Sequence, residues 1–532
     1  LGVDHVFGVV GSGNFHVTNA MTARGARFVA ARHEGGAATM ADAFARTSDS
    51  VAAVTLHQGC GLTNAMTGIT EAVKSRTPLL VLAAEATEPH SNFYVDQAAM
   101  ARAVGAVPLR VTSGDRAVAE ATEAVAVARH QRRTVLLNLP LHVQGELTPG
   151  ESAPPVLPAP PPAPAPDPAD LASLAEALER SRRPVFVAGR GARGARAPLE
   201  SVAERYGALL ATSAVARGLF VGNPWSLDVS GGFASPLAAE LIGGADLIVG
   251  WGCALNMWTM RHGRLIAEDA TVVQVDDTPD ALGVHRDIQL GVVGDVAATA
   301  EALLDLTGAA GTGVRYRTDA LRDRIAREVR WRDVAYEDGS SGERIDPRTL
   351  SIALDDLLPP ERVVAVDSGN FMGYPSMYLS VPDHRGFCFT QAFQSIGLGL
   401  ATAIGAALAQ PDRLPVAALG DGGALMAAAE LDTVRRLGLP MVVVVYNDAA
   451  YGAEVHHFGP GGHPLDTVTF PETDIASIGR GYGFEAITVR GLDDLSPVAT
   501  WLAGPRSAPL LIDAKVTRDR GSWWLEEAFR GH

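Results

Sequence analysis

The sequence of 532 residues contains little cysteine and no long apolar run. Its three cysteines, Cys60, Cys253 and Cys388, lie far apart and form no Cys-x-x-Cys pair. We therefore expect a reduced intracellular protein with incidental thiols. Because no run of 18 or more apolar residues is present and no signal-peptide pattern is visible, we also expect a cytoplasmic protein without a membrane span.

Positive charge is also scarce, because the formal net charge at pH 7 is −16. Binding to nucleic acid needs clustered Lys and Arg side chains, so this balance argues against nucleic acid as the main partner. A small anionic ligand remains compatible with the charge, since backbone N–H groups and a metal ion can supply positive potential locally.

Proline is concentrated in one place, where ten of the twenty residues from 149 to 168 are proline. Such a stretch forms neither a helix nor a central strand, so it predicts an extended, semi-rigid linker. The charged segment 307–345 predicts a second linker, within which 321–332 should form an exposed helix. The length suits about three domains, which we place at 1–148, 169–306 and 346–532.

Short apolar runs alternate with longer amphipathic segments in each of these regions. Such runs are typical of buried parallel strands in βαβ units. The sequence therefore predicts an α/β protein with three doubly wound parallel-sheet domains. A strand pattern starts within ten residues of Leu1, so we expect a helix ahead of it. The predicted strands are 6–10, 51–56, 78–84 and 134–139 in the first region, 184–188, 246–250 and 271–275 in the second, and 362–366, 415–419, 440–446 and 509–513 in the third.

Two acidic residues follow neighbouring strands of the last region. Gly420-Asp421-Gly422-Gly423 ends one strand and precedes a helix predicted over 424–438, and Asn447-Asp448 ends the next strand. Glycines let the backbone approach a phosphate closely, and a helix N-terminus offers unpaired N–H groups to an anion. The separation of Asp421 from Asp448 suits one strand–helix–strand unit, which places both carboxylates at the same sheet edge. These oxygen ligands predict a Mg²⁺ site that also binds a diphosphate.

This pattern resembles the cofactor-binding motif of thiamine diphosphate-dependent enzymes, in the group of acetolactate synthase, benzoylformate decarboxylase and pyruvate decarboxylase. The resemblance covers the chain in the order pyrimidine-binding, middle and diphosphate-binding domain. It implies Mg²⁺ held by Asp421, Asp448 and the backbone carbonyl of Ala450, although the family usually has Asn where this chain has Asp448. It also implies cofactor contacts from Asn370, Gly420, Gly422, Gly423, Tyr451 and Gly452.

The run Arg32-His33-Glu34-Gly35-Gly36 opens a helix predicted to extend to Arg46. By resemblance, Glu34 contacts N1′ of the aminopyrimidine and favours the imino tautomer, which removes the proton from thiazolium C2. This role needs a buried carboxyl that is easily kept protonated, and the Gly/Ala-rich context of Glu34 predicts such burial. The resemblance also makes Ile396 the bulky residue that bends the cofactor, with backbone groups of Gln394 and Ile396 on the pyrimidine.

Further polar residues are candidates for the substrate side of the site. Ser12 and His57 match a Ser and a His of benzoylformate decarboxylase, and Glu454 matches a Glu of pyruvate decarboxylase. A His and a Glu near C2 could relay protons, although each residue also has a plain structural reading as a turn serine, a satisfied histidine or a surface glutamate. The second catalytic His of benzoylformate decarboxylase has no clear counterpart. Thr259 falls near its place, with His262 close by, and other candidates for the pocket lining are Gln97, His90, His456 and His457.

The resemblance implies a cofactor that acts as an electron sink through a carbanion at C2 and cleaves or forms a C–C bond next to a carbonyl. A 2-oxo acid decarboxylase would end in protonation, and a carboligase of the acetolactate synthase kind would use an aldehyde or ketone acceptor. Acetolactate synthases lack a His at His57 and commonly have Gly-Pro-Gly where this chain has Gly59-Cys60-Gly61, which argues against a plain biosynthetic acetolactate synthase. A lyase or hydrolase acting on a hydroxyketone or a dione is the third reading.

Two other classes are disfavoured. A catalytically inactive homologue would have no physical reason to keep Glu34, Asp421 and Asp448. A nicotinamide-dependent oxidoreductase would want Gly-x-Gly-x-x-Gly after the first strand, and Gly11-Ser12-Gly13 begins that pattern but His16 ends it.

The resemblance also bears on the middle region and on assembly. The middle region resembles the flavin-binding domain of acetolactate synthase in layout, at 249–253 and 275–276, but it has no specific flavin signature, so we expect no FAD. In the family, each active site lies between the pyrimidine domain of one chain and the diphosphate domain of another. This implies a homodimer at least and favours a homotetramer.

Overall fold

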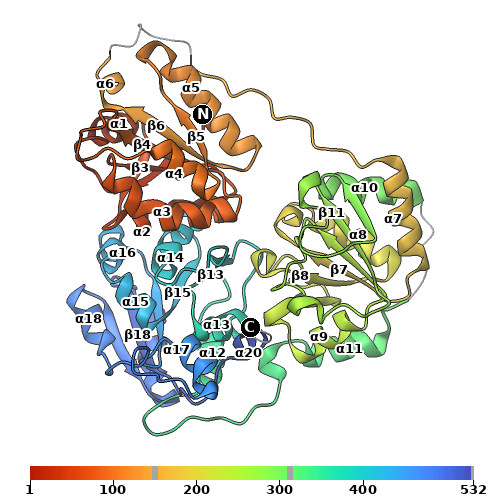
Figure 1. Cartoon of the computed structure of the whole chain (residues 1–532). Coiled ribbons are helices and arrows are strands. Elements are labelled where there is room, and N and C mark those ends of the chain that lie inside the picture. The colour runs from red at the N-terminus through yellow and green to blue at the C-terminus, as the bar shows by residue number, and fades with distance from the viewer. Residues whose placement is uncertain (147–153, 308–314, 529–532) are drawn as a thin grey trace.

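The computed structural model describes residues 1–146, 154–307 and 315–528. Its backbone forms three six-stranded sheets with interleaved helices (Figure 1). Every strand pairing within these sheets is parallel. The prediction of an α/β protein with three doubly wound parallel sheets is confirmed.

The first sheet has the strand order β2-β1-β3-β4-β6-β5. Its strands are β1 (His5–Gly8), β2 (Arg27–Ala30), β3 (Ala52–Leu56), β4 (Leu79–Glu85), β5 (Val107–Arg110) and β6 (Thr134–Pro140). Its helices are α1 (Phe15–Ala23), α2 (Glu34–Ser48), α3 (Cys60–Lys74), α4 (Gln97–Val104), α5 (Ala117–His130) and α6 (Leu141–Gln144).

The second sheet has the order β12-β11-β10-β7-β8-β9. Its strands are β7 (Pro184–Ala188), β8 (Leu209–Thr212), β9 (Ser226–Val229), β10 (Leu247–Trp251), β11 (Thr271–Asp276) and β12 (Leu290–Val293). The accompanying helices are α7 (Pro168–Arg180), α8 (Arg196–Tyr206), α9 (Pro236–Gly243), α10 (Val296–Thr307) and α11 (Asp319–Glu328).

The third sheet has the order β14-β13-β15-β16-β18-β17. Its strands are β13 (Arg362–Val366), β14 (Phe387–Phe389), β15 (Leu414–Gly420), β16 (Val442–Asn447), β17 (Glu485–Val489) and β18 (Leu510–Lys515). Its helices are α12 (Pro347–Leu357), α13 (Gly373–Tyr378), α14 (Gly399–Ala409), α15 (Asp421–Met426), α16 (Glu430–Leu437), α17 (Gly452–Phe458), α18 (Ile475–Gly481), α19 (Ser496–Ala503) and α20 (Trp523–Ala528).

Each of the eleven predicted strands is present, with ends that differ by at most two residues, whereas β2, β5, β8, β9, β12, β14 and β17 were not predicted. The single helix predicted over 424–438 is wrong. The chain forms α15 and α16 instead, with Ala427 as the C-cap of α15 and Ala429 as the N-cap of α16. The buried Glu430 at the start of α16 then bonds the backbone of the first unit.

The two segments predicted as linkers contain helical parts. Residues 154–166 have no helix or strand, but Pro168 already lies in α7, where Asp167 caps the helix through the Ala169 N–H at 2.8 Å. In the second segment, the helix covers Asp319–Glu328 rather than 321–332. It is not fully exposed, because Ile325 is buried in an apolar cluster of the middle unit. Residues 149–153 and 308–314 lie outside the described part.

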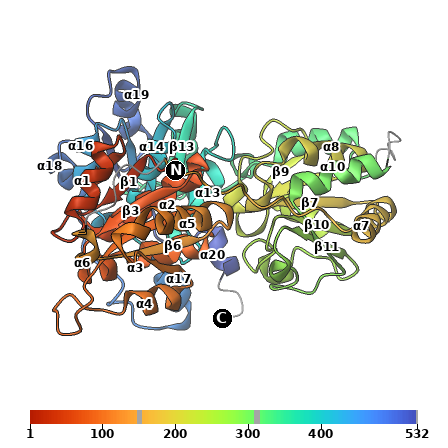
Figure 2. The ribbon, with the colours of Figure 1, turned by 90° about the horizontal axis from the view of Figure 1, so that it is seen from above.

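The first and third units pack closely, whereas the middle unit stands to one side (Figures 1 and 2). Helices α2 and α14 meet so closely that a Cβ on Gly405 would lie 2.1 Å from the Met40 carbonyl oxygen. One apolar core runs through both units, and the middle unit has cores of its own. Within the described ranges, no helix has the length and apolar character that crossing a bilayer requires.

Candidate active site

The carboxyl ends of two neighbouring strands carry the predicted metal ligands. Strand β15 pairs in parallel with β16, with Gly420 opposite Tyr446. Asp421 follows β15 directly as the first residue of α15, and Asp448 follows β16. Both side chains are buried. The structure therefore brings together the two carboxylates at the edge where open parallel sheets bind ligands.

The two carboxyl groups lie close enough for the charge of Asp421 to act on the pKa of Asp448. Burial, and then the negative charge of Asp421, raise the pKa of Asp448 to about 8. Burial raises the pKa of Asp421 to about 6. A divalent cation between such groups would offset both their mutual repulsion and the cost of their burial.

The loop after Asp448 is fixed by its neighbours. Ala449 has a positive φ of 55°, and the Ala450 N–H donates to Asp448 Oδ1 at 3.2 Å. The Tyr451 N–H donates to the Val468 carbonyl at 2.8 Å. In the described ranges, no three His, Cys, Asp or Glu side chains gather as a metal cluster. A metal at this edge would therefore complete its shell with backbone and ligand oxygens and water.

Glycines bring the backbone close to the carboxylates of Asp367 and Asp448. A Cβ on Gly423 would lie 2.1 Å from Asp367 Oδ2, and one on Gly452 would lie 2.3 Å from Asp448 Oδ2. Any side chain at either position would displace a carboxylate. This cradle suits a diphosphate, because an anion can approach backbone N–H groups that no Cβ shields.

Asn370, a predicted cofactor contact, lies beside the same loop. Its Oδ1 accepts a hydrogen bond from the Ser522 N–H at 2.8 Å, and its Nδ2 lies 3.4 Å from the Cβ position of Gly452. Its carbonyl accepts hydrogen bonds from Ser522 Oγ and Trp524 Nε1. The C-terminal segment thus orients Asn370 so that its amide N–H groups face the diphosphate cradle. Sequence reasoning missed Ser522 and Trp524, because no local pattern links them to a residue so far away.

Gln394 and Ile396 lie between β14 and α14, in a segment without regular structure. Gln394 has a positive φ of 63°. The buried Asp367 accepts the Gly397 N–H at 3.0 Å and the Leu398 N–H at 3.2 Å. Burial raises the pKa of Asp367 to about 6. Asp367 was missed although it carries the same signal as Asp421, an acidic residue directly after an apolar strand.

Glu34 begins α2, and the third unit anchors that helix start. Glu430 Oε1 accepts the Arg32 and His33 N–H groups, both at 3.0 Å. The Glu34 carboxylate accepts Asn64 Nδ2 at 3.0 Å, a contact that sequence reasoning missed. The side chain of Glu34 is half-buried, so the predicted burial is not found within one chain. Among the described residues, no hydrogen bond or ion pair joins Glu34 to the ligand edge of the third sheet.

Ser12 and His57 lie near Glu34 at the carboxyl edge of the first sheet. His57 Nδ1 accepts the Gly13 N–H at 3.2 Å, and its ring packs edge-on against Phe93. Ser12 is exposed. Gln97 does not face a pocket, because its buried side chain bonds the Gly59 N–H at 3.3 Å and Asn138 Oδ1 at 2.8 Å.

The remaining candidates are scattered. Glu454 is exposed in the first turn of α17, and burial lowers the pKa of His456 on the same helix. His457 also lies on α17, and its ring contacts Phe458. His90 is exposed in the first unit, whereas Thr259 and His262 belong to the middle unit.

Models of known families match each of the three units. The description "Thiamine pyrophosphate enzyme, N-terminal TPP binding domain" matches residues 1–103, the central domain matches 171–303, and the C-terminal TPP binding domain matches 367–514.

The chain belongs to the thiamine pyrophosphate-dependent enzymes.

Thiamine pyrophosphate is thiamine diphosphate, so the family expected from the motifs is confirmed. Sulfoacetaldehyde acetyltransferase of Rhodobacter capsulatus is 28% identical over 99% of this chain and 94% of its own length. A Pseudomonas aeruginosa protein with the provisional name 2-ketoarginine decarboxylase AruI is 28% identical over 93% of the chain and 88% of its own length. A Mycobacterium tuberculosis protein with the provisional name acetolactate synthase large subunit IlvB2 is 29% identical over 93% and 92%. These names span transferases and lyases of the expected kind.

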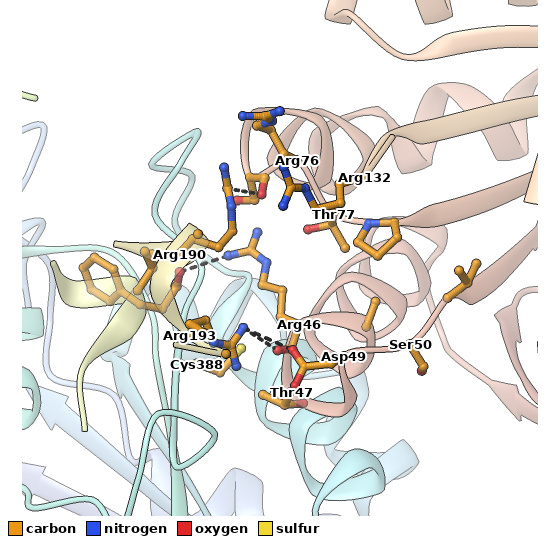
Figure 3. A pocket seen from close by; sticks show the side chains of 18 of the residues that line it. Arg46, Thr47, Asp49, Ser50, Arg76, Thr77, Arg132, Arg190, Arg193 and Cys388 are labelled. Carbon is orange, nitrogen blue, oxygen red and sulfur yellow. Dashed lines mark hydrogen bonds and ion pairs between the residues drawn. The ribbon is translucent and has the colours of Figure 1, made fainter. Parts of the chain in front are cut away.

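A separate cavity of about 400 Å³ lies where the three units meet, away from the ligand edge (Figure 3). It is rich in arginine. Burial, and then the charges of Arg76 and Arg132, lower the pKa of Arg190 to about 10. The wall also includes β14, which leads into the segment that carries Gln394 and Ile396. The arginines that line the cavity are Arg46, Arg76, Arg129, Arg132, Arg190 and Arg193.

Proposed function

We propose that this thiamine diphosphate enzyme requires Mg²⁺ and cleaves or forms a C–C bond next to the carbonyl of a 2-oxo acid. The observation that carries the proposal is the buried pair Asp421 and Asp448 at the carboxyl edge of β15 and β16. A thiamine diphosphate-dependent enzyme needs a cation between protein oxygens and the diphosphate, and this pair supplies carboxylates of the type that Mg²⁺ prefers.

The residues divide into two groups around the cofactor. Asp421, Asp448 and the Ala450 carbonyl would hold Mg²⁺. Asn370 would donate to the diphosphate, and the glycines of the cradle, Gly420, Gly422, Gly423 and Gly452, would let it approach, with Tyr451 beside them. Bound there, thiamine diphosphate supplies an electron sink for the bond that breaks.

Glu34 would hold a proton at N1′ of the pyrimidine. This pyrimidine would belong to a cofactor held by the diphosphate edge of a second chain, because among the described residues no hydrogen bond or ion pair joins Glu34 to that edge of its own chain. His57 and Ser12 would then face the reacting carbon from the same side as Glu34, and Glu454 would face it from the side of the diphosphate.

The apolar surface beside each half-site supports a homodimer as the smallest active unit. Phe93 is 43% exposed beside His57, and Met426 is 56% exposed on α15. A second chain that covered both side chains would remove this apolar area from water. A homotetramer and a cytoplasmic location remain predictions from the resemblance and the composition.

The proposed site fits two reaction outcomes. In the first, His57 or Glu454 delivers a proton after CO₂ leaves, and an aldehyde is released. In the second, the acyl unit passes to an acceptor, an outcome supported by the acetyltransferase names of several relatives. Both begin with addition to the same carbonyl, so the residues that bind the cofactor are the same.

The test is a panel of 2-oxo acids with thiamine diphosphate and Mg²⁺, with and without acceptor aldehydes or phosphate, followed by CO₂ release and product mass. The Glu34→Gln variant runs alongside. We expect CO₂ release that needs both cofactors and falls by roughly a hundredfold or more in Glu34→Gln, because the amide cannot hold the proton at N1′. Tight cofactor binding without CO₂ release from any acid would contradict the 2-oxo acid reaction. It would indicate a lyase or hydrolase that acts on a hydroxyketone or dione.

A further inference from the structure

No helix or strand of its own fixes the conformation of the segment that carries Gln394 and Ile396. It connects β14 to α14 without a strand partner or helical turn of its own. Gln394 occupies the left-handed region with a φ of 63°, which costs a residue other than glycine conformational energy. Such a conformation persists only when the surrounding structure fixes the backbone on both sides.

Glu71 fixes the side of the segment that comes from β14. This glutamate lies on α3 of the first unit and is fully buried. Its Oε1 accepts the Ala392 N–H at 3.0 Å, and its Oε2 accepts the Phe393 N–H at 2.6 Å. Lys74, on the same helix, lies over the Phe393 ring with 5.7 Å between Nζ and the ring centroid. One helix of the first unit therefore holds two successive amides immediately before the strained Gln394.

Asp367 fixes the other side, through the Gly397 and Leu398 N–H groups. The strained residue and Ile396 thus lie between two buried carboxylates that come from different units of the fold. Asp367 ties the segment to the start of α14, whose N-cap is Leu398, and Glu71 ties it to α3.

Arg46 forms an ion pair with the buried carboxylate of Glu71. Arg46 Nη2 donates to Glu71 Oε1 at 2.8 Å, and Arg46 Nη1 donates to the Phe389 carbonyl at 3.1 Å. A buried carboxylate is costly unless it is paired and hydrogen-bonded, and an apolar side chain would fill the space with less penalty. The arrangement is therefore explained better by the geometry that it imposes on the segment than by packing.

We propose that Glu71 is a positioning residue for the bent cofactor. It acts through the backbone of Ala392 and Phe393 and places Ile396 and the pyrimidine-binding groups of Gln394. The inference rests on the proposed function, because it needs thiamine diphosphate at this edge. It predicts that Glu71 affects the pyrimidine side of the cofactor and leaves the diphosphate side at Asp421 and Asp448 unaffected.

The variant is Glu71→Gln, which keeps the shape but faces an amide N–H group toward an N–H donor. Glu120→Gln is the matched control. Glu120 accepts the Thr112 N–H at 2.8 Å, Thr112 Oγ1 at 2.6 Å and Arg116 Nε at 2.9 Å, and thus has the same kinds of partner as Glu71. It lies in the same unit, away from the segment.

Two measurements are made on the full-length protein. Hydrogen exchange of the cofactor-free protein should show the amides of 389–398 exchanging roughly tenfold or more faster in Glu71→Gln, with no change there in Glu120→Gln. Calorimetry should show thiamine diphosphate binding weakened by roughly tenfold or more in Glu71→Gln. The affinity for inorganic diphosphate with Mg²⁺ should stay the same.

Unchanged exchange at 389–398 would overturn the inference, and so would an equal loss of affinity for thiamine diphosphate and for inorganic diphosphate, which indicates general destabilisation. If wild-type protein binds no thiamine diphosphate, the proposed function fails and the cofactor role of Glu71 fails with it. The exchange result would still decide independently whether Glu71 holds the segment.

Discussion

The buried carboxyl groups of Asp421 and Asp448 lie at the carboxyl edge of two neighbouring strands, where the charge of Asp421 acts on Asp448. Burial raises the pKa of Asp421 to about 6, whereas burial and then the charge of Asp421 raise the pKa of Asp448 to about 8. Between the ordinary carboxyl range and these values, the folded protein holds protons that the unfolded chain has released. The free energy of unfolding contributed by the pair is therefore largest at low pH and falls as the pH rises toward 8.

The first prediction follows from this sign. The melting temperature of the cofactor-free protein should fall between about pH 5 and about pH 8.5, and Mg²⁺ should raise it most at the alkaline end, where no proton has to be displaced. Thermal melts with and without Mg²⁺ measure both effects, and Asp448→Asn should flatten the dependence. A melting temperature that responds equally to Mg²⁺ at every pH would contradict this reading.

Substitutions at Asp448 should separate the contribution of its oxygen ligand from that of its negative charge to the affinity for Mg²⁺. Asp448→Asn keeps an oxygen ligand and removes the repulsion with Asp421, so the affinity for Mg²⁺ with thiamine diphosphate should stay within roughly tenfold of wild type. Asp448→Ala removes the ligand and should lose roughly a hundredfold or more. Titration calorimetry of the three proteins measures this, and similar losses in Asn and Ala variants would show that the negative charge is required.

The contact between Gly405 and Met40 predicts that the first and third units unfold together. A methyl group on Gly405 would meet the Met40 carbonyl oxygen at 2.1 Å, so Gly405→Ala should lower the free energy of unfolding by about 1–3 kcal/mol. Gly243→Ala is the control, because no atom lies within 4 Å of its Cβ position. It should be neutral or stabilising by up to about 1 kcal/mol in urea denaturation. Equal effects of the two substitutions would disprove the tight α2–α14 packing.

Assembly can be tested at the exposed apolar side chains. Met426→Glu places a charge on the surface that a second chain should cover, so the variant should be monomeric and should lose activity although it stays folded. Val156, which is 84% exposed in the linker, provides the control substitution Val156→Glu. Light scattering gives the mass of each protein. A monomeric wild type with full activity would refute the two-chain site.

The eleven longer apolar strands and the position of the acidic pair at the sheet edge could be predicted from the sequence, because their signals are local. Apolar runs of strand length locate β15 and β16, and one acidic residue after each strand locates Asp421 and Asp448. The break between α15 and α16 has no local signal, because alanines at 427–429 favour a helix and only the tertiary bonds of Glu430 favour the turn.

The environment of Glu34 and the roles of Gln97 and Glu71 could not be predicted, because they depend on contacts between distant segments. Gly/Ala-rich neighbours suggest burial, but the half-exposed Glu34 lies on a surface that one chain leaves open. Gln97 is bonded to Gly59 and Asn138, and Glu71 to amides more than 300 residues away. Contacts between distant segments depend on how the units dock, and no periodicity in the sequence records that.

The central claim is that Asp421 and Asp448 bind thiamine diphosphate through Mg²⁺. Titration calorimetry of purified protein with thiamine diphosphate, with Mg²⁺ and with a chelator, tests it most directly. The account predicts one cofactor per chain, binding that requires Mg²⁺, and loss of that binding in Asp421→Ala with the fold intact. Binding that is unaffected by the chelator, or equal in Asp421→Ala and wild type, would contradict it.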